Sequence, residues 1–440
     1  MKIGFVSLGC SKNLVDTEVM LKRLADAGYT ITPDETEADI IVVNTCGFIQ
    51  SAKEEAIDNI LDVAWLKKNR ALKGIIATGC LVERYREQVL EEMPEVDAVL
   101  GTGSYHKIVE AVEAVARGEK YASFEDKNAA PLGGERIVTT PPYTAYLKVA
   151  EGCDNRCTYC AIPLIRGRMR SRRMEDVVAE AKSLEKIGVK ELNIIAQDTS
   201  RYGLDLYGKY MLPELVQKIL AETQIPWIRL LYLYPDKITD ELVAVICDND
   251  RVCKYVDLPI QHVNDTVLAR MNRHGDGAVV RAAVEKIRRE IPGVTLRTTA
   301  IVGFPGETEA QFAELCEFVK ETGFDRFGAF TYSPEEGTPA AEFPDQIDEQ
   351  VKQDRYDTLM AVQLEVSEKK MQEKIGDVIE VLCEGYDPVA GVQYGRSRAD
   401  APDVDGKVYF TSAKKLPEGV FVNVKITKAL DYDLFGEAVR

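Results

Sequence analysis

The sequence has 440 residues, enough for roughly two to four domains, and its 45% hydrophobic and 29% charged residues are typical of a soluble globular protein. Its formal net charge of −17 argues against a protein that mainly binds nucleic-acid phosphates and favours a basic protein partner. No apolar run approaches the ~20 residues of a membrane span.

The chain begins "MKIGFVSLGC", whose lysine, short apolar run and cysteine loosely resemble a lipoprotein signal. The run falls short of, or barely reaches, the ~7–15 residues of a signal core, so we interpret it as a buried first strand and expect a cytoplasmic protein. Disulfides are rare there, so ten cysteines indicate metal or redox chemistry. With only His106, His262 and His274 present, thiolates are the expected metal ligands.

Residues 1–118 alternate strand and helix patterns. Each apolar run precedes a segment of helical periodicity, and these runs are 2–9, 38–45, 73–79 and 97–103. Strands that alternate with helices predict an open parallel α/β sheet covered on both faces. A polar stretch with prolines at 119–142 then predicts a linker.

Residues 143–371 repeat the alternation with strand-like runs at 144–152, 191–197, 227–233, 255–261, 296–303 and 326–333. These strand–helix units predict a partial (βα)6 barrel whose functional end lies at the carboxyl ends of its strands. Residues 372–440 show short strands between Gly, Pro and Asp turns instead. They predict a small antiparallel β-barrel.

The segment "EGCDNRCTYC" places Cys153, Cys157 and Cys160 directly after the first strand of the (βα)6 region. A structural zinc site needs four ligands, and no histidine lies nearby to complete one. A [4Fe–4S] cluster tolerates three protein thiolates, which leaves one iron open to an outside ligand. We therefore predict such a cluster here, with a zinc knuckle or a chance grouping as the alternative.

This spacing resembles the signature of radical S-adenosylmethionine (SAM) enzymes, including an aromatic residue, Tyr159, before the last cysteine. The resemblance implies that SAM chelates the open iron and is cleaved to methionine and a 5′-deoxyadenosyl radical. An arginine-rich run at 166–173 follows, and we expect it to bind carboxylates or backbone phosphate.

Other parts of the signature are partial. The glycine–glycine–glutamate often seen after the second strand is replaced by "AQDTSRYG", where Gln197 and Asp198 are candidates to contact the amino group of SAM. After the fifth strand, "VGFPGET" offers Gly303 for close backbone approach and Glu307 near the ligand. His262 ends the fourth strand, where a structural histidine is the better interpretation. No catalytic residue is predicted.

The first region carries three further cysteines, each beside a glycine and just beyond a predicted strand: Cys10, Cys46 and Cys80. Open α/β sheets bind ligands at the carboxyl ends of their strands, so these thiols are expected to converge. One buried cysteine would be unremarkable. Three in equivalent places predict a second three-thiolate cluster.

Two triads, a (βα) barrel and a terminal β-barrel together resemble the radical-SAM methylthiotransferase family over essentially the whole chain. The resemblance implies two [4Fe–4S] clusters and SAM as cofactors, and a terminal barrel of the TRAM type. It also implies a reaction that replaces a C–H bond with C–S–CH3. One SAM is the radical source and a second is the methyl donor.

Within the family, "GCSKNLVDTE", "NTCGFIQSAKEEAID" and "DYDLFGEA" are similar to the branch that modifies the β-carbon of an aspartate on a small-subunit ribosomal protein. The implied partners are that protein and an electron donor such as flavodoxin or ferredoxin, with RNA contact secondary and no membrane. Residues 372–440 contain nine Lys/Arg and twelve Asp/Glu, and this acidic balance suits a basic protein. We expect the terminal barrel to hold it while an arginine of 166–173 binds the target carboxylate.

The nearest alternative is a methylthiotransferase that acts on a tRNA adenosine, because the cluster motifs are shared. Only the run Gly47-Phe48-Ile49 and the acidic terminal barrel argue against it. Alternatives of other classes are a non-catalytic iron–sulfur redox or sensor protein and a zinc-binding module. SAM binding would count against the first, and bound zinc without sulfide would support the second.

Overall fold

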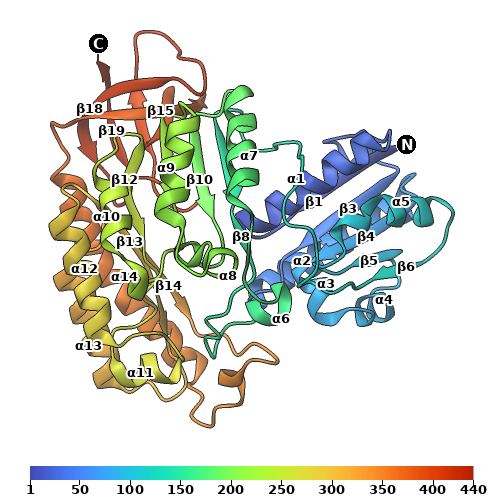
Figure 1. Cartoon of the computed structure of the whole chain (residues 1–440), viewed down its shortest axis with the longest axis horizontal. Coiled ribbons are helices and arrows are strands. Elements are labelled where there is room, and N and C mark those ends of the chain that lie inside the picture. Colours follow the sequence, from blue (N-terminus) through green and yellow to red (C-terminus); the bar gives the residue numbers. More distant parts are fainter. Residues whose placement is uncertain (440) are drawn as a thin grey trace.

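The computed structural model describes residues 1–439, which form three units in chain order. In Figure 1 the N-terminal unit (blue) lies on the right, the central unit (green to orange) on the left, and the C-terminal unit (red) above the central one. Within the described residues, no helix has both the length and the apolar character needed to cross a membrane.

The N-terminal unit is the open parallel sheet that the sequence predicts, with strand order β2-β1-β3-β4-β5-β6. The strands are β1 (Lys2–Ser7), β2 (Thr30–Ile31), β3 (Ile40–Thr45), β4 (Gly74–Gly79), β5 (Ala98–Leu100) and β6 (Tyr121–Ser123). The helices are α1 (Ser11–Asp26), α2 (Gln50–Asn69), α3 (Cys80–Tyr85), α4 (Gln88–Glu92) and α5 (Ile108–Ala116). A separate apolar core lies on each face of the sheet, one under α1 and α5 and the other under α2.

The central unit is the expected partial (βα)6 barrel, a parallel sheet of order β14-β13-β12-β11-β10-β7. Its strands are β7 (Thr144–Lys148), β10 (Glu191–Ile195), β11 (Trp227–Leu230), β12 (Val252–Asp257), β13 (Thr295–Val302) and β14 (Arg326–Thr331). The helices that flank them are α7 (Met174–Lys186), α8 (Leu204–Tyr207), α9 (Leu212–Glu222), α10 (Asp240–Cys247), α11 (Asp265–Arg270), α12 (Gly277–Glu290), α13 (Glu309–Thr322) and α14 (Glu349–Gln372). Between β7 and α7 the chain forms the short β8 (Ala150–Glu151), α6 (Ile162–Arg166) and β9 (Arg170–Ser171).

The C-terminal unit is a closed barrel of order β15-β16-β17-β19-β18. Its strands are β15 (Val378–Asp387), β16 (Val392–Ser397), β17 (Val408–Thr411), β18 (Phe421–Ala429) and β19 (Leu434–Val439). One pair departs from the expected antiparallel pattern, because β17 and β19 run parallel and close the barrel. The remaining pairs are antiparallel.

The C-terminal barrel packs across the amino ends of the central strands (Figure 1). Arg396 of β16 binds Glu191, the first residue of β10, at 2.5 Å, and Tyr146 of β7 donates to Asp403 at 2.9 Å. Trp227 at the start of β11 stacks on Phe421, with ring centroids 4.9 Å apart. The C-terminal barrel therefore closes the end of the (βα)6 barrel opposite to the carboxyl ends of its strands.

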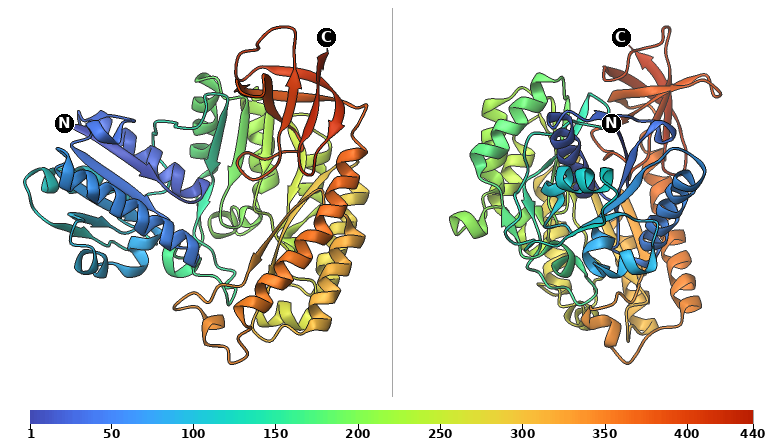
Figure 2. Two further views of the ribbon diagram at one scale, coloured as in Figure 1. Left: turned by 180° about the vertical axis from the view of Figure 1, so that it is seen from behind. Right: turned by 90° about the vertical axis from the view of Figure 1, so that its right-hand side faces the viewer.

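The sheets show where one unit ends and the next begins. β6 pairs with β5, so the N-terminal sheet extends past the predicted limit at residue 118. The following segment crosses between the two units in the left-hand view of Figure 2. The other limits, at residues 142 and 371, lie next to the start of β7 and the end of α14. The domain limits stay predictions.

Candidate active site between two cysteine triads

The first triad lies in the loop between β8 and α6, at the carboxyl end of the first barrel strand. The Cys157 sulfur is 3.4 Å from the Tyr234 hydroxyl, and Arg273 stacks over the same Tyr234 ring with its guanidinium carbon 3.9 Å from the ring centroid. Burial raises the pKa of Cys153 to about 12, and burial together with Cys157 raises the pKa of Cys160. These thiols keep their protons until a metal displaces them.

The second triad is drawn from three neighbouring strands of the N-terminal sheet. Cys10 precedes α1 after β1, Cys46 follows β3, and Cys80 begins α3 after β4. A Cβ placed on Gly9 would lie 2.9 Å from the Cys46 sulfur, so only glycine lets the first loop pass this close to the second. The pKa of Cys80 is raised to about 12, chiefly by burial, against the lowering effect of Arg166 and with a contribution from the nearby Cys10 and Cys46. The structure thus brings the three strand-end cysteines together.

Neither triad forms a compact single-ion site. Among residues 1–439, no group of three or more His, Cys, Asp or Glu side chains could hold one metal ion. A single ion with Zn–S bonds of about 2.3 Å draws its thiolates to within about 4 Å of one another. In a [4Fe–4S] cluster each thiolate binds a different iron, so a wider triad fits. The six cysteines stay the predicted ligands.

A buried ionic network joins the N-terminal triad to the central barrel. Arg166, at the end of α6, points at the Cys80 sulfur at 3.4 Å and pairs with Asp16 of α1. Lys148 pairs with the same Asp16 and, at 2.7 Å, with Glu151. Burial alone would raise the pKa of Glu151, but Lys148 and Arg166 outweigh it and hold that pKa at about 2. Two cations and two carboxylates therefore balance each other, and Arg166 is the member that contacts the Cys80 sulfur.

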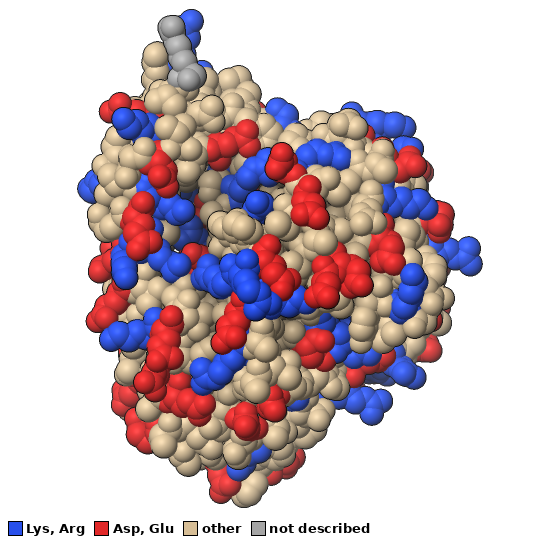
Figure 3. Space-filling model, turned by 60° about the vertical axis from the view of Figure 1, so that its left-hand side comes forward, with Lys and Arg blue, Asp and Glu red and all other residues tan. Residues whose placement is uncertain are grey.

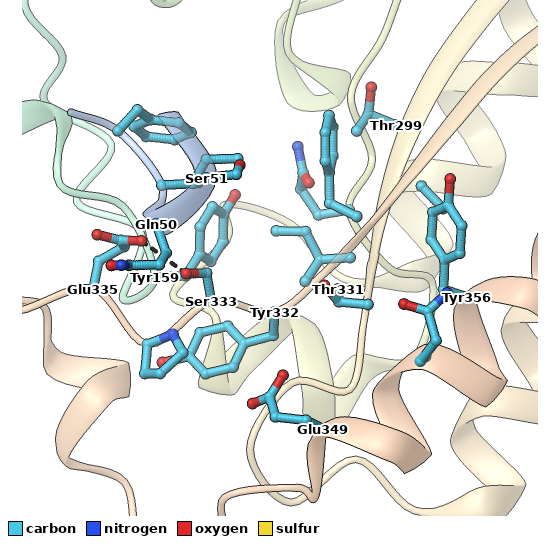
Figure 4. Close-up of a pocket in the computed structure, with 18 of the residues that line it drawn as sticks. Gln50, Ser51, Tyr159, Thr299, Thr331, Tyr332, Ser333, Glu335, Glu349 and Tyr356 are labelled. Atoms are coloured by element: carbon cyan, nitrogen blue, oxygen red, sulfur yellow. Dashed lines mark hydrogen bonds between the residues drawn. The ribbon is translucent and has the colours of Figure 1, made fainter. Parts of the chain in front are cut away.

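A cavity of about 820 Å³ opens between the two triads, at the carboxyl ends of the barrel strands. Figure 4 shows Gln50 and Ser51 entering from α2, Tyr159 from the first cysteine loop, and Thr299 and Thr331 from β13 and β14. The full lining is Phe48, Ile49, Gln50, Ser51, Glu54, Tyr159, Gln261, Thr299, Ile301, Ala329, Phe330, Thr331, Tyr332, Ser333, Pro334, Glu335, Glu349, Gln353 and Tyr356. A volume of this size accommodates a cofactor-sized ligand.

The cavity wall carries the carboxylates of Glu54, Glu335 and Glu349 among apolar and uncharged polar side chains. No lysine or arginine is among its lining residues in the part of the chain that the structure describes. Glu335 is buried and its carboxylate binds Lys53 at 3.0 Å and Arg84 at 2.7 Å, so its charge is compensated from behind the wall. These pairs also tie the loop after β14 to the N-terminal unit.

The SAM-contact candidates after β10 are engaged within the protein. The Gln197 amide donates to Glu151 at 2.5 Å, and Asp198 accepts from Asn155 at 2.7 Å and from Ser200 at 2.5 Å. Neither Gln197 nor Asp198 lines the 820 Å³ cavity. Through Asn155, which lies inside the first cysteine loop, Asp198 fixes the shape of that loop. Contact of either residue with SAM stays a prediction.

The candidates after β13 also have partners of their own. Glu307 is buried, and its carboxylate binds His262 at 3.1 Å, Arg355 at 2.9 Å and the Gly303 amide at 2.5 Å. Gly303 has φ +72°, and a Cβ there would lie 2.3 Å from Cγ of Lys352. The glycine is thus required by the packing of α14. His262 is the structural histidine that the sequence favoured, and SAM contact by Gly303 or Glu307 stays a prediction.

The arginine run 166–173 does not reach the cavity, contrary to the expectation that it binds the substrate carboxylate. Arg170 donates to the carbonyls of Lys127 and Ala130 at 2.6 Å, and Arg172 binds Glu180 at 2.6 Å. Arg170 thus holds the segment between the units in place, and Arg172 is engaged by a carboxylate of α7.

Sequence reasoning missed most of the cavity wall. Thr299 and Ile301 of β13 are partly exposed while their neighbours Thr298, Ala300 and Val302 are buried, so alternate residues face the cavity. Successive side chains of a strand point to opposite faces, but the sequence of β13 does not alternate between polar and apolar residues. The face that lines the cavity could therefore not be identified from the sequence. Gln261 joins them as a bridge partner of Ala300.

Comparisons with known proteins cover the whole chain. Three family models match: Uncharacterized protein family UPF0004 at residues 2–101, the Radical SAM superfamily at 147–319 and the TRAM domain at 375–439. A protein of Desulforamulus reducens named ribosomal protein uS12 methylthiotransferase RimO is 50% identical, and the alignment covers 100% of this chain and 99% of that one. One of the same name from Thermoanaerobacter sp. strain X514 is also 50% identical over 99% of both chains.

Solved structures agree on the fold. The radical SAM methyltransferase TsrM of Kitasatospora setae, with cobalamin and a [4Fe–4S] cluster bound, matches with a TM-score of 0.57 and 14% identity over 77% of this chain and 73% of that one. The cobalamin-dependent radical SAM enzyme OxsB matches with a TM-score of 0.51 and 11% identity over 82% of this chain and 56% of that one. The expected fold class is confirmed.

The family expected from the sequence is confirmed as well, and with it SAM and two [4Fe–4S] clusters as the cofactors of this kind of enzyme. The chain is 50% identical to the Desulforamulus protein over its entire length, and the three family models match in the expected order. Both findings assign it to the same family. The chain belongs to the RimO family of radical SAM methylthiotransferases.

Proposed function

We propose that this protein replaces a hydrogen on the β-carbon of an aspartate of ribosomal protein uS12 with a methylthio group. One observation carries the proposal: a single cavity is lined both by Tyr159, between two cysteines of the first triad, and by Phe48–Ser51, directly after Cys46 of the second. A substrate in this cavity therefore lies beside segments that carry both triads. The relatives that match over the whole chain are named for methylthiolation of uS12.

When bound, SAM and the two clusters supply the radical that takes the hydrogen and the methylthio group that replaces it. The residues of the chain hold these groups and shape the space between them. The cysteine triads are the proposed ligands, and the cavity wall shields a reactive carbon centre from water. Because no lysine or arginine lines the cavity among the described residues, hydroxyl and amide donors such as Thr299, Thr331 and Gln50 receive the target carboxylate.

The proposed partners follow from charge. The chain carries a net charge of −17, and on the face drawn in Figure 3 acidic and basic side chains are interspersed rather than gathered into a continuous basic surface. A basic protein substrate suits this chain better than an RNA backbone, so RNA contact is secondary. We further propose flavodoxin or ferredoxin as the electron donor and the cytoplasm as the site of action.

The test is mass spectrometry of ribosomal proteins and tRNA from cells with and without this protein. The proposal predicts a methylthio group on one aspartate of uS12 that disappears with the gene, while tRNA is unchanged. Loss of a methylthioadenosine from tRNA with uS12 unaltered would instead establish the tRNA enzyme.

A further inference from the structure

The outward face of α2 carries a row of exposed apolar side chains. Ile57, Leu61 and Trp65 are 38%, 49% and 57% exposed and lie four residues apart, so they stand above one another on one side of the helix. The opposite side is buried on the sheet, through Ala56, Ile60 and Val63. Single exposed apolar residues are ordinary, but a row that ends in a tryptophan is typical of a surface that binds a protein.

Acidic side chains flank this row. Asp58 and Asp62 are exposed beside Leu61, and neither forms an ion pair within residues 1–439. Glu55 is exposed on the same part of the helix. A mixed apolar and acidic face repels phosphate and attracts a protein surface that combines apolar groups with lysine or arginine. A tryptophan in this setting also accepts a partner's cation over its ring.

This face is continuous with the cavity. Gln50, Ser51 and Glu54, at the start of α2, line the cavity, and Glu54 lies on the same side of the helix as Leu61 and Trp65. In the left-hand view of Figure 2, α2 runs along the outside of the N-terminal sheet with one end beside the central unit. At 1.5 Å per residue, the face extends about 16 Å from Glu54 to Trp65.

We propose that the α2 surface, formed by Ile57, Asp58, Leu61, Asp62 and Trp65, docks uS12 while its target aspartate occupies the cavity. The inference rests on the proposed function and adds the element that recognises the substrate. The occupant is a basic stretch of uS12 next to the target loop, with an apolar side chain against Leu61 and Trp65 and cations against Asp58 and Asp62. The C-terminal barrel lies at the other end of the central strands, so α2 is better placed to hold the substrate than that barrel is.

The experiment measures the Kd of the full-length protein for purified, fluorescently labelled uS12. One variant, Leu61→Ala with Trp65→Ala, removes the apolar row, and another, Asp58→Lys with Asp62→Lys, reverses its charge. The matched control is Glu317→Lys with Glu321→Lys on α13, which has the same spacing and charge change on exposed residues elsewhere. Thermal unfolding and iron content verify that each variant folds.

Each α2 variant should raise the Kd about tenfold or more, and the control should leave it unchanged. Added salt should shrink the effect of the charge reversal and preserve that of the apolar substitution. Wild-type affinity in both folded α2 variants, with a wild-type enzyme that methylthiolates uS12, would overturn the docking surface alone. A wild-type enzyme that neither binds nor modifies uS12 would overturn the proposed function, and the surface with it.

Discussion

At the scale of single residues, position in the fold separates the six predicted cluster ligands from the other cysteines. Cys153, Cys157 and Cys160 were predictable from their spacing, and Cys10, Cys46 and Cys80 from their places at strand ends. The partner of Arg166 was not predictable, because Asp16 lies on another unit 150 positions earlier in the sequence. Glu307 looked like a ligand contact for the same reason, since its partners His262 and Arg355 come from distant segments.

The two triads should be separable by substitution. Replacing Cys153, Cys157 and Cys160 with Ala should halve the iron content, from about eight per chain after anaerobic reconstitution, and abolish 5′-deoxyadenosine formation from SAM. Replacing Cys10, Cys46 and Cys80 should also halve the iron but leave that formation in place. Cys247→Ala with Cys316→Ala is the control, because neither residue lies in a triad. Full iron in the second triple variant would contradict the N-terminal cluster.

Glu335 should stabilise the contact between the cavity loop and the N-terminal unit. Glu335→Gln leaves Lys53 and Arg84 without their carboxylate, so the free energy of unfolding should fall by about 1–3 kcal/mol in urea titrations. Protease cleavage of the loop that follows β14 should become faster. The neighbouring Glu336→Gln is the matched control, because that side chain is exposed. Equal stability of the two variants would show that the buried pairs contribute nothing.

At the scale of elements, alternation and helical periodicity predicted the long strands and their order, whereas β2, β6 and the parallel closure of β17 on β19 depend on contacts that no local pattern reveals. The docking of the C-terminal barrel was also missed. The sequence predicted residues 372–440 only as a small β-barrel of its own. In the structure, deletion would uncover Glu191 and Arg229, which are fully buried beside Arg396.

Stability of this interface should depend on pH. Burial would raise the pKa of Glu191, but Arg396 and Arg229 outweigh it and lower the pKa to about 2. The folded pKa lies below the unfolded one, so the contribution is fully present above about pH 4.5 and is lost as the pH falls toward 2. Glu191→Gln should therefore cost about 3 kcal/mol at pH 7 and little near pH 2.

Trp227 offers a direct readout, because it packs on Phe421 of the C-terminal barrel and its indole N–H donates to Glu380 at 3.2 Å. In a Trp65→Phe background it is the single tryptophan of the chain, so its fluorescence in urea follows undocking. Glu437→Gln, at an exposed position of β19, is the control. A cost of Glu191→Gln that stayed constant from pH 7 to pH 2 would contradict the ion-pair account.

At the scale of the whole molecule, the three units have different positions relative to one cavity. The N-terminal sheet and the central barrel each line it with residues next to a cysteine triad, and the C-terminal barrel closes the far end of the central strands. Family and reaction were within reach of the sequence, because six cysteines at specific places are a rare pattern. The cavity wall was not, because its residues come from α2, β13, β14 and α14, which meet only in the folded chain.

The most direct test of the central claim is the reaction itself, carried out with the anaerobically reconstituted enzyme, SAM, a reductant and either purified uS12 or tRNA. Tandem mass spectrometry should place one methylthio group on the β-carbon of a single uS12 aspartate and none on tRNA. A Cys157→Ala enzyme should give neither product. A methylthiolated tRNA adenosine, with uS12 unmodified under the same conditions, would contradict the account.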